Sequence, residues 1–150
     1  MQYRIRPVQE TDIPTVVEMC REHAAYEEAA YVEHDQESKL RLALFSEQPQ
    51  LECWVVATEA GLIGYTSFMM QFSTWDAAYY LYMDCLFLRP EARSLGIGVV
   101  LMENLRQLAF ERGCMNIQWQ TPSFNDGAVR FYERLGAVAK VKQRFIWSTQ

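Results

Sequence analysis

The chain has 150 residues, of which 50% are hydrophobic and 22% are charged, and its formal net charge is −5. This composition excludes a disordered chain, and the length predicts a single domain over residues 1–150. Because Lys and Arg form no cluster, the sequence argues against nucleic acid as a partner. No apolar run reaches the ~20 residues of a membrane-spanning helix, and the N-terminus lacks the apolar core of a secretory signal. We therefore expect a cytoplasmic protein with no membrane partner.

The four cysteines are scattered along the chain, without a Cys-x-x-Cys pair and without a histidine close by in sequence. Metal sites need clustered ligands, so no metal is expected. We interpret Cys20, Cys53, Cys85 and Cys114 as small buried residues in a reducing compartment.

Hydrophobic periodicity predicts strands and helices in a mixed order, which indicates an α/β class protein, an α+β sandwich. Thr11-Asp12-Ile13-Pro14 offers capping oxygens and an early proline, so the first helix is expected to begin there. In chain order the expected elements are a strand over Tyr3–Arg6, this first helix, an irregular loop over Ala25–Gln36, a helix over Ser38–Phe45, a hairpin of Trp54–Thr58 with Leu62–Phe72, a strand over Ala78–Leu88, a helix over Val99–Arg112, a short strand over Asn116–Gln120, a helix over Asn125–Leu135, and a final strand or pair over Val138–Trp147.

A glycine loop, Arg93-Ser94-Leu95-Gly96-Ile97-Gly98, joins the expected central strand to an amphipathic helix. Unpaired N–H groups at the start of a helix, together with the helix dipole, form a site for phosphate. A Walker-type loop is excluded because Gly98 is followed by Val99 and Val100. A dinucleotide fingerprint is excluded because Leu101 stands where a third small residue is required.

A second block follows, Asn125-x-x-Ala128-x-x-Phe131-Tyr132-x-x-x-Gly136-Ala137, after a short predicted strand. With Arg-x-x-Gly-x-Gly upstream and Ile-Arg-Pro…Asp-Ile-Pro at the start, the chain resembles the GNAT N-acetyltransferases over nearly its whole length. Tyr26-Glu27 and Tyr82-Met83-Asp84 are similar to the spermidine/spermine (diamine) acetyltransferase branch. The long aromatic strand before Trp75 adds to this likeness.

The resemblance implies a mixed central sheet of six to seven strands, splayed near the cofactor and flanked by about four helices. It also implies acetyl-CoA as cosubstrate, a small-molecule amine as acceptor, and a homodimer. The residues that it assigns to acetyl-CoA are Leu86, Phe87, Leu88, Arg93, Ser94, Leu95, Gly96, Ile97, Gly98, Val99, Asn125, Ala128 and Tyr132. The Leu86 N–H is the expected oxyanion donor, and Arg93 adds charge or orders the loop. As an alternative, Asn125 is only the N-cap of its helix.

The implied chemistry is attack of an amine on the thioester carbonyl. An alkylamine with a pKa of ~10.4 arrives protonated, so a group must accept its proton, and the leaving thiolate must receive one. Asp84 is the candidate base, which accepts the proton directly or through water. Two alternatives are that Asp84 only attracts the cationic substrate, or that it has no function and is a buried aspartate that caps a backbone kink. Tyr132 is the candidate acid, with a core tyrosine as the alternative. Cys85 stands where the diamine branch has a second acid.

Tyr26, Glu27, Asp84, Gln118, Trp119 and Gln120 are the residues that the resemblance places on the substrate side. Glu27 is expected to hold the distal ammonium of a diamine, polyamine or basic amino-acid analogue, although an acidic stretch is also typical of a solvated loop. His23 and His34 lie outside both motifs and are interpreted as incidental. The alternatives are an acetyltransferase for an aminoglycoside or a protein lysine, and a non-catalytic acyl-CoA sensor.

Overall fold

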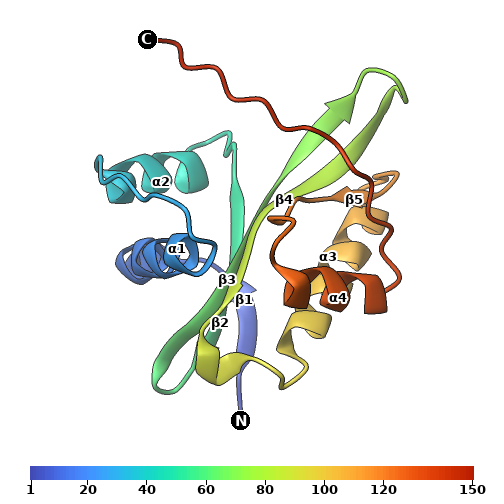
Figure 1. The fold of residues 1–150 in the computed structure, drawn as a ribbon. Coiled ribbons are helices and arrows are strands. Elements are labelled where there is room, and N and C mark those ends of the chain that lie inside the picture. Colours follow the sequence, from blue (N-terminus) through green and yellow to red (C-terminus); the bar gives the residue numbers. More distant parts are fainter. The chain divides into compact units, whose positions relative to one another are not determined.

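The computed structural model describes residues 1–150, which form two compact units, Met1–Gln120 and Thr121–Gln150. The first unit holds a sheet and three α-helices, and the second holds one α-helix (Figure 1). In chain order the elements are β1 (Arg4–Pro7), the 3-10 turn η1 (Glu10–Asp12), α1 (Ile13–Tyr26), α2 (Gln36–Phe45), β2 (Glu52–Thr58), β3 (Gly61–Ser73), β4 (Ala78–Leu88), the 3-10 turn η2 (Pro90–Ala92), α3 (Ile97–Glu111), β5 (Ile117–Gln118) and α4 (Asp126–Arg134).

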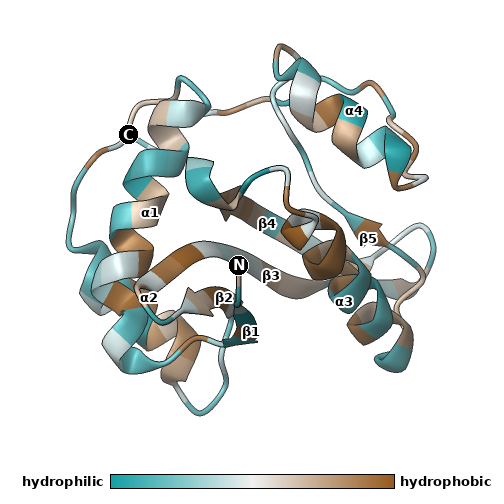
Figure 2. Cartoon of the chain, turned by 90° about the horizontal axis from the view of Figure 1, so that it is seen from below, coloured by the Kyte–Doolittle hydropathy of each residue, from teal (hydrophilic) through white to brown (hydrophobic).

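The sheet has five strands in the order β1-β2-β3-β4-β5. The first three pairings are antiparallel and the last, β4 with β5, is parallel, so the sheet is mixed. Helices α1 and α2 cover one face and α3 covers the other (Figures 1 and 2). The predicted α/β fold class is therefore confirmed, and the helix and strand positions predicted through residue 112 agree to within about two residues.

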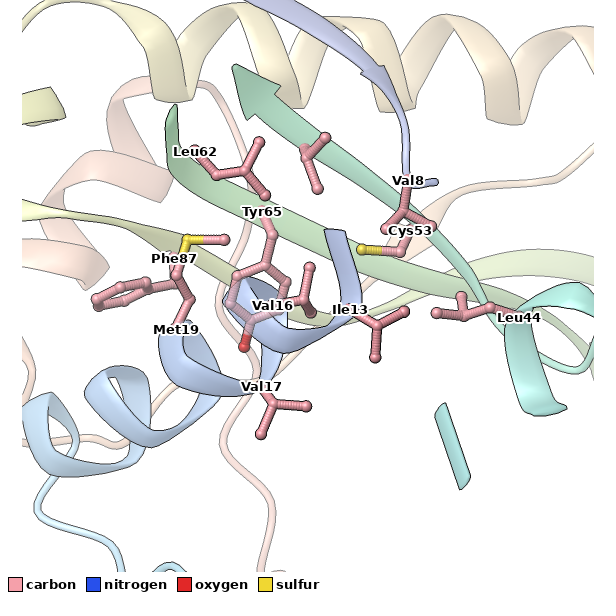
Figure 3. Packing of buried hydrophobic residues seen from close by; sticks show 11 residues of the cluster. Val8, Ile13, Val16, Val17, Met19, Leu44, Cys53, Leu62, Tyr65 and Phe87 are labelled. Carbon is pink, nitrogen blue, oxygen red and sulfur yellow. The ribbon is translucent and has the colours of Figure 1, made fainter. Parts of the chain in front are cut away.

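Two apolar clusters hold the layers together because neighbouring strand residues point to opposite faces. On the α1 side, Val55, Tyr65 and Phe87 pack with Ile13 and Met19, as Figure 3 shows for the cluster. On the α3 side, Val56 and Ile63 pack with Ile97, Ala92 and Leu101. None of the helices combines the length and apolar composition that a membrane crossing requires.

In the second unit, the Asn125 side chain accepts the Ala128 N–H at 3.2 Å and begins α4 at the expected position. The final strand or pair expected over Val138–Trp147 is wrong: these residues form no strand, and Val141 and Trp147 are 97% and 95% exposed. The sheet consequently has five strands instead of six to seven, and β5 spans two residues instead of five. Alternating side chains favour extended backbone, but a strand forms only where a partner takes its hydrogen bonds.

Candidate active site

Strand β4 changes its surroundings along its length. It pairs with β3 from Ala78 to Leu88, but with β5 only at Leu81 and Tyr82. In this first half, the Leu81 N–H donates to Asn116 O at 3.1 Å and Tyr79 O accepts the Met115 N–H at 2.9 Å. From Met83 to Leu88, no strand of the sheet lies along the second edge. The predicted splaying of the sheet is present here.

A β-bulge at Asp84 separates the two halves. Ser67 pairs with Cys85 and the next residue, Phe68, pairs with Met83, so Asp84 has no partner on β3. Beyond the bulge the Arg89 N–H donates to Ile63 O at 2.9 Å, toward β3. Since backbone groups alternate between the two edges, those of Leu86 and Leu88 face the open edge. The resemblance assigned both to the cosubstrate. Phe87, which it also assigned, pairs with Tyr65 on β3 and its side chain is buried in the α1-side cluster.

The glycine loop follows the open edge directly. Ser94 and Gly96 have φ of +61° and +81°, in the left-handed region, and Gly96 is the N-cap of α3 without a side-chain cap. The first backbone bond into this helix runs from the Val100 N–H to Gly96 O, so the N–H groups of Ile97, Gly98 and Val99 have no carbonyl partner within α3. The loop thus presents several amides at the positive end of a helix dipole.

Arg93 orders this loop. Its Nε donates to Leu88 O at 2.8 Å, and its guanidinium lies 4.4 Å from the Tyr26 ring centroid and 5.6 Å from that of Phe87. These contacts join the end of β4, the glycine loop and the end of α1. Of the two roles expected for Arg93, they support ordering of the loop.

Asp84 is exposed, which does not fit the alternative of a buried aspartate. Its neighbour Cys85 is partly buried and directs its thiol to the Asp84 carboxylate at 3.7 Å. Burial raises the pKa of Cys85 to about 12, with a smaller contribution from the negative charge of Asp84. Cys85 is therefore a neutral thiol at neutral pH, and Asp84 supplies the negative charge at the bulge.

The end of α1 carries Tyr26 and Glu27. Arg89 anchors this helix to the end of β4, because its guanidinium donates to both carboxylate oxygens of Glu22 at 2.9 and 3.1 Å and to Leu62 O at 3.0 Å. Tyr26 is half exposed and stacks with Arg93, while Glu27 is partly buried. This anchoring places the predicted substrate residues of α1 next to the loop that follows β4.

The remaining predicted residues lie on β5, just after it, and on α4. Gln120 Nε2 donates to the Tyr82 hydroxyl at 2.8 Å and Gln118 Nε2 donates to Asn116 Oδ1 at 3.1 Å, while Trp119 is partly buried. In the second unit, Asn125 and Ala128 form the cap of α4, and the partly buried Tyr132 contacts the ring of Phe131 with centroids 5.2 Å apart.

Sequence reasoning missed His23. Its ring is partly buried between α1 and the sheet and stacks on Phe87 with centroids 5.2 Å apart. It hydrogen-bonds the Tyr65 hydroxyl and contacts the Glu27 carboxylate. The spacing of four residues between His23 and Glu27 was a usable signal, because such pairs share a helix face. The contact with Tyr65 links α1 to β3 and had no signal in the sequence.

An opened strand edge, an exposed carboxylate at a bulge and a loop of helix amides follow one another along β4 and into α3 of a mixed α/β sheet. The described residues contain no group of His, Cys, Asp and Glu placed to hold a metal ion. A profile described as Acetyltransferase (GNAT) family matches residues 16–137. The chain belongs to this family and is an N-acetyltransferase.

Relatives support this assignment. Thialysine N-epsilon-acetyltransferase of Mus musculus is 28% identical over 142 residues, covering 89% of this chain and 83% of the relative. L-ornithine N5-acetyltransferase NATA1 of Arabidopsis thaliana is 27% identical over 74 residues, 49% of this chain and 32% of that protein. In fold, the chain resembles the aminoglycoside acetyltransferase meta-AAC0020 from an uncultured soil sample in complex with sisomicin, with TM-score 0.79 and 19% identity over 99% and 96% of the two chains.

Proposed function

We propose that the protein transfers the acetyl group of acetyl-CoA directly to a terminal primary amine of a small diamine, polyamine or basic amino acid. The observation that carries this proposal is the open edge of β4 at Leu86 and Leu88, between the carboxylate of Asp84 and the amides of the glycine loop. An extended cosubstrate pairs with such an edge as an added strand would. Its diphosphate is held by the amides from Ser94 to Val99.

In this mechanism Asp84 accepts the proton of the incoming ammonium, directly or through water. The Leu86 N–H stabilises the oxyanion, and the Tyr132 hydroxyl protonates the leaving thiolate. No cysteine is needed as a nucleophile, since the thiol of Cys85 is held neutral. We propose that residues 1–150 act as one domain; the cytoplasmic location and the homodimer also stay predictions of the resemblance.

The proposed acceptor class is supported by the negative charge of Glu27 and by the substrates named for two relatives. Tyr26 and Glu27 stand at the end of α1, and the named substrates of the two relatives, thialysine and L-ornithine, fit an acceptor with a second cationic group. Glu27 is the proposed partner of that second group. Gln118, Trp119 and Gln120 are proposed to line the same side.

Release of CoA thiol from acetyl-CoA across a panel of amines tests the proposal. We expect turnover with α,ω-diamines and basic amino acids, reduced in Glu27→Gln and unchanged in the neighbouring exposed Glu28→Gln. Turnover only with aminoglycosides or a lysine peptide would move the acceptor to those classes. CoA binding without turnover of any amine would identify a sensor and overturn the proposal.

A further inference from the structure

Both ring nitrogens of His23 lie close to polar groups. Nδ1 lies 3.2 Å from the Tyr65 hydroxyl on β3, and Nε2 lies 2.5 Å from Oε2 of Glu27, four residues further along the chain. The ring also stacks on Phe87 of β4 at an interplanar angle of 25°. The imidazole therefore bridges the strands that carry the open edge and the carboxylate at the end of α1.

The chemistry of the partners limits the direction of these contacts. An ionised carboxylate only accepts, so the contact with Glu27 requires a proton on Nε2. When Nδ1 carries no proton, it accepts a hydrogen bond from the Tyr65 hydroxyl. Tyr65 is 2% exposed and burial raises its pKa well above the usual value, so the phenol keeps the proton that it donates. The imidazole of His23 thus lies between the Tyr65 hydroxyl and the Glu27 carboxylate.

These two contacts restrain a side chain at the end of a helix. Glu27 is the C-cap of α1, and Glu28 after it has φ +56°, so the backbone leaves the helix here. A Leu at position 23 would fill the space beside Phe87 but would leave the buried Tyr65 hydroxyl without its His23 partner. What the imidazole adds is a fixed position for the Glu27 carboxylate.

We propose that His23 is a positioning residue for acceptor specificity, which holds Glu27 where it meets the second cationic group of a diamine or basic amino acid. The inference rests on the proposed function. It predicts a role in binding the second charge and none in the acetyl transfer itself.

The test compares an α,ω-diamine with the n-alkylamine of the same length in His23→Leu. We expect KM for the diamine to rise about tenfold, the loss of one charged hydrogen bond. Its kcat and the KM of the monoamine should stay within about twofold. His23→Gln, whose amide replaces the donor to Glu27, should recover most of the loss. His34→Leu, at the exposed histidine beside Lys39, is the matched control and should behave as wild type.

A double-mutant cycle shows whether His23 acts through Glu27. In the Glu27→Gln background, His23→Leu should add no further rise in diamine KM. Tyr65→Phe, which keeps the ring and removes the donor to Nδ1, should raise diamine KM less than His23→Leu does. Additive effects, equal changes for the two amines, or unchanged selectivity in an active His23→Leu would overturn this inference alone. A wild type that acetylates no amine would overturn the proposed function and this role with it.

Discussion

The two halves of β4 differ in what lies along their second edge. Up to Tyr82 the strand is paired with β3 and β5, whereas from Met83 onward only β3 accompanies it. The first half is therefore a regular part of the sheet. In the second half Arg93 donates to Leu88 O, while the N–H groups of Leu86 and Leu88 face an edge that has no strand partner. The bulge at Asp84 divides the two halves and supplies the only carboxylate on the strand. The proposed function therefore depends on an interruption of the regular sheet at one residue.

The largest effect on activity is expected at Asp84, where the two halves of β4 meet. Asp84→Asn should lower kcat roughly 100-fold or more, because the ammonium of the acceptor loses its proton acceptor. Since Asp84 is exposed, the free energy of unfolding should change by less than about 0.5 kcal/mol. Steady-state kinetics and thermal unfolding measure both. Asp76→Asn, in the hairpin turn beyond the closed half, is the control and should keep full activity; similar rates in both variants would remove Asp84 from the mechanism.

The next largest effect is expected on stability, at Gly64 of β3, which packs against the open half of β4. A Cβ at Gly64 would lie 2.5 Å from Leu88 Cδ2 and 2.8 Å from the backbone oxygen of Phe87, so β3 and β4 must separate to admit it. Gly64→Ala should lower the free energy of unfolding by about 2 kcal/mol and raise KM for acetyl-CoA.

Gly127→Ala in α4 meets nothing within 4 Å and is the matched control. Because alanine favours a helix over glycine, this variant should be as stable as wild type or up to about 1 kcal/mol more stable. Denaturant unfolding of the two variants measures the difference. A tolerated Gly64→Ala would show that the open half is not held tightly against β3.

Tyr132 tests the contribution of the second unit. Tyr132→Phe should lower kcat at least ~10-fold if its hydroxyl protonates the thiolate, with little change in KM for acetyl-CoA. Tyr79→Phe, an exposed tyrosine in the closed half of β4, serves as control and should not change the rate. An unchanged rate in Tyr132→Phe would assign the proton to another donor.

The smallest effect is expected on stability, at Asp12, which lies away from the open edge of β4. Asp12 accepts two hydrogen bonds from Arg6, at 2.7 and 3.1 Å, and the Gln9 N–H at 2.8 Å. The hydrogen bond from Arg6 lowers the pKa of Asp12 below its usual value, with a smaller lowering from Gln9. A lowered pKa stabilises the fold above the unfolded-state value of about 3.9, and this contribution is lost as pH falls through the folded-state value.

Asp12→Asn should therefore cost about 1 kcal/mol at pH 7 and nothing at a pH below both values, without a change in kcat. Denaturant unfolding across this pH range is the measurement, and Glu10→Gln at the exposed neighbouring site is the control. A loss of activity would contradict the separation between the structural and functional parts of the sheet.

Much of the fold could be predicted from the sequence because its signals are local. The glycine loop, the Asn125 cap and the helix faces each follow from a backbone or packing requirement within a few residues. The bulge was not predictable, since an aspartate in an apolar strand indicates exposure but does not give the register with β3. The contact of His23 with Tyr65 joins residues 42 apart in the chain. For the final strand expected over Val138–Trp147, the sequence does not say whether a partner strand exists.

Amide hydrogen exchange with and without CoA tests the central claim most directly. In the free protein the Leu81 amide should exchange slowly, because it is bonded to Asn116, while Leu86 and Leu88 exchange fast at the open edge. Added CoA should slow exchange at Leu86 and Leu88 and at the amides from Gly96 to Val99, and leave Leu81 unchanged. Slow exchange at Leu86 and Leu88 before CoA is added, or no change at these amides afterwards, would contradict the account.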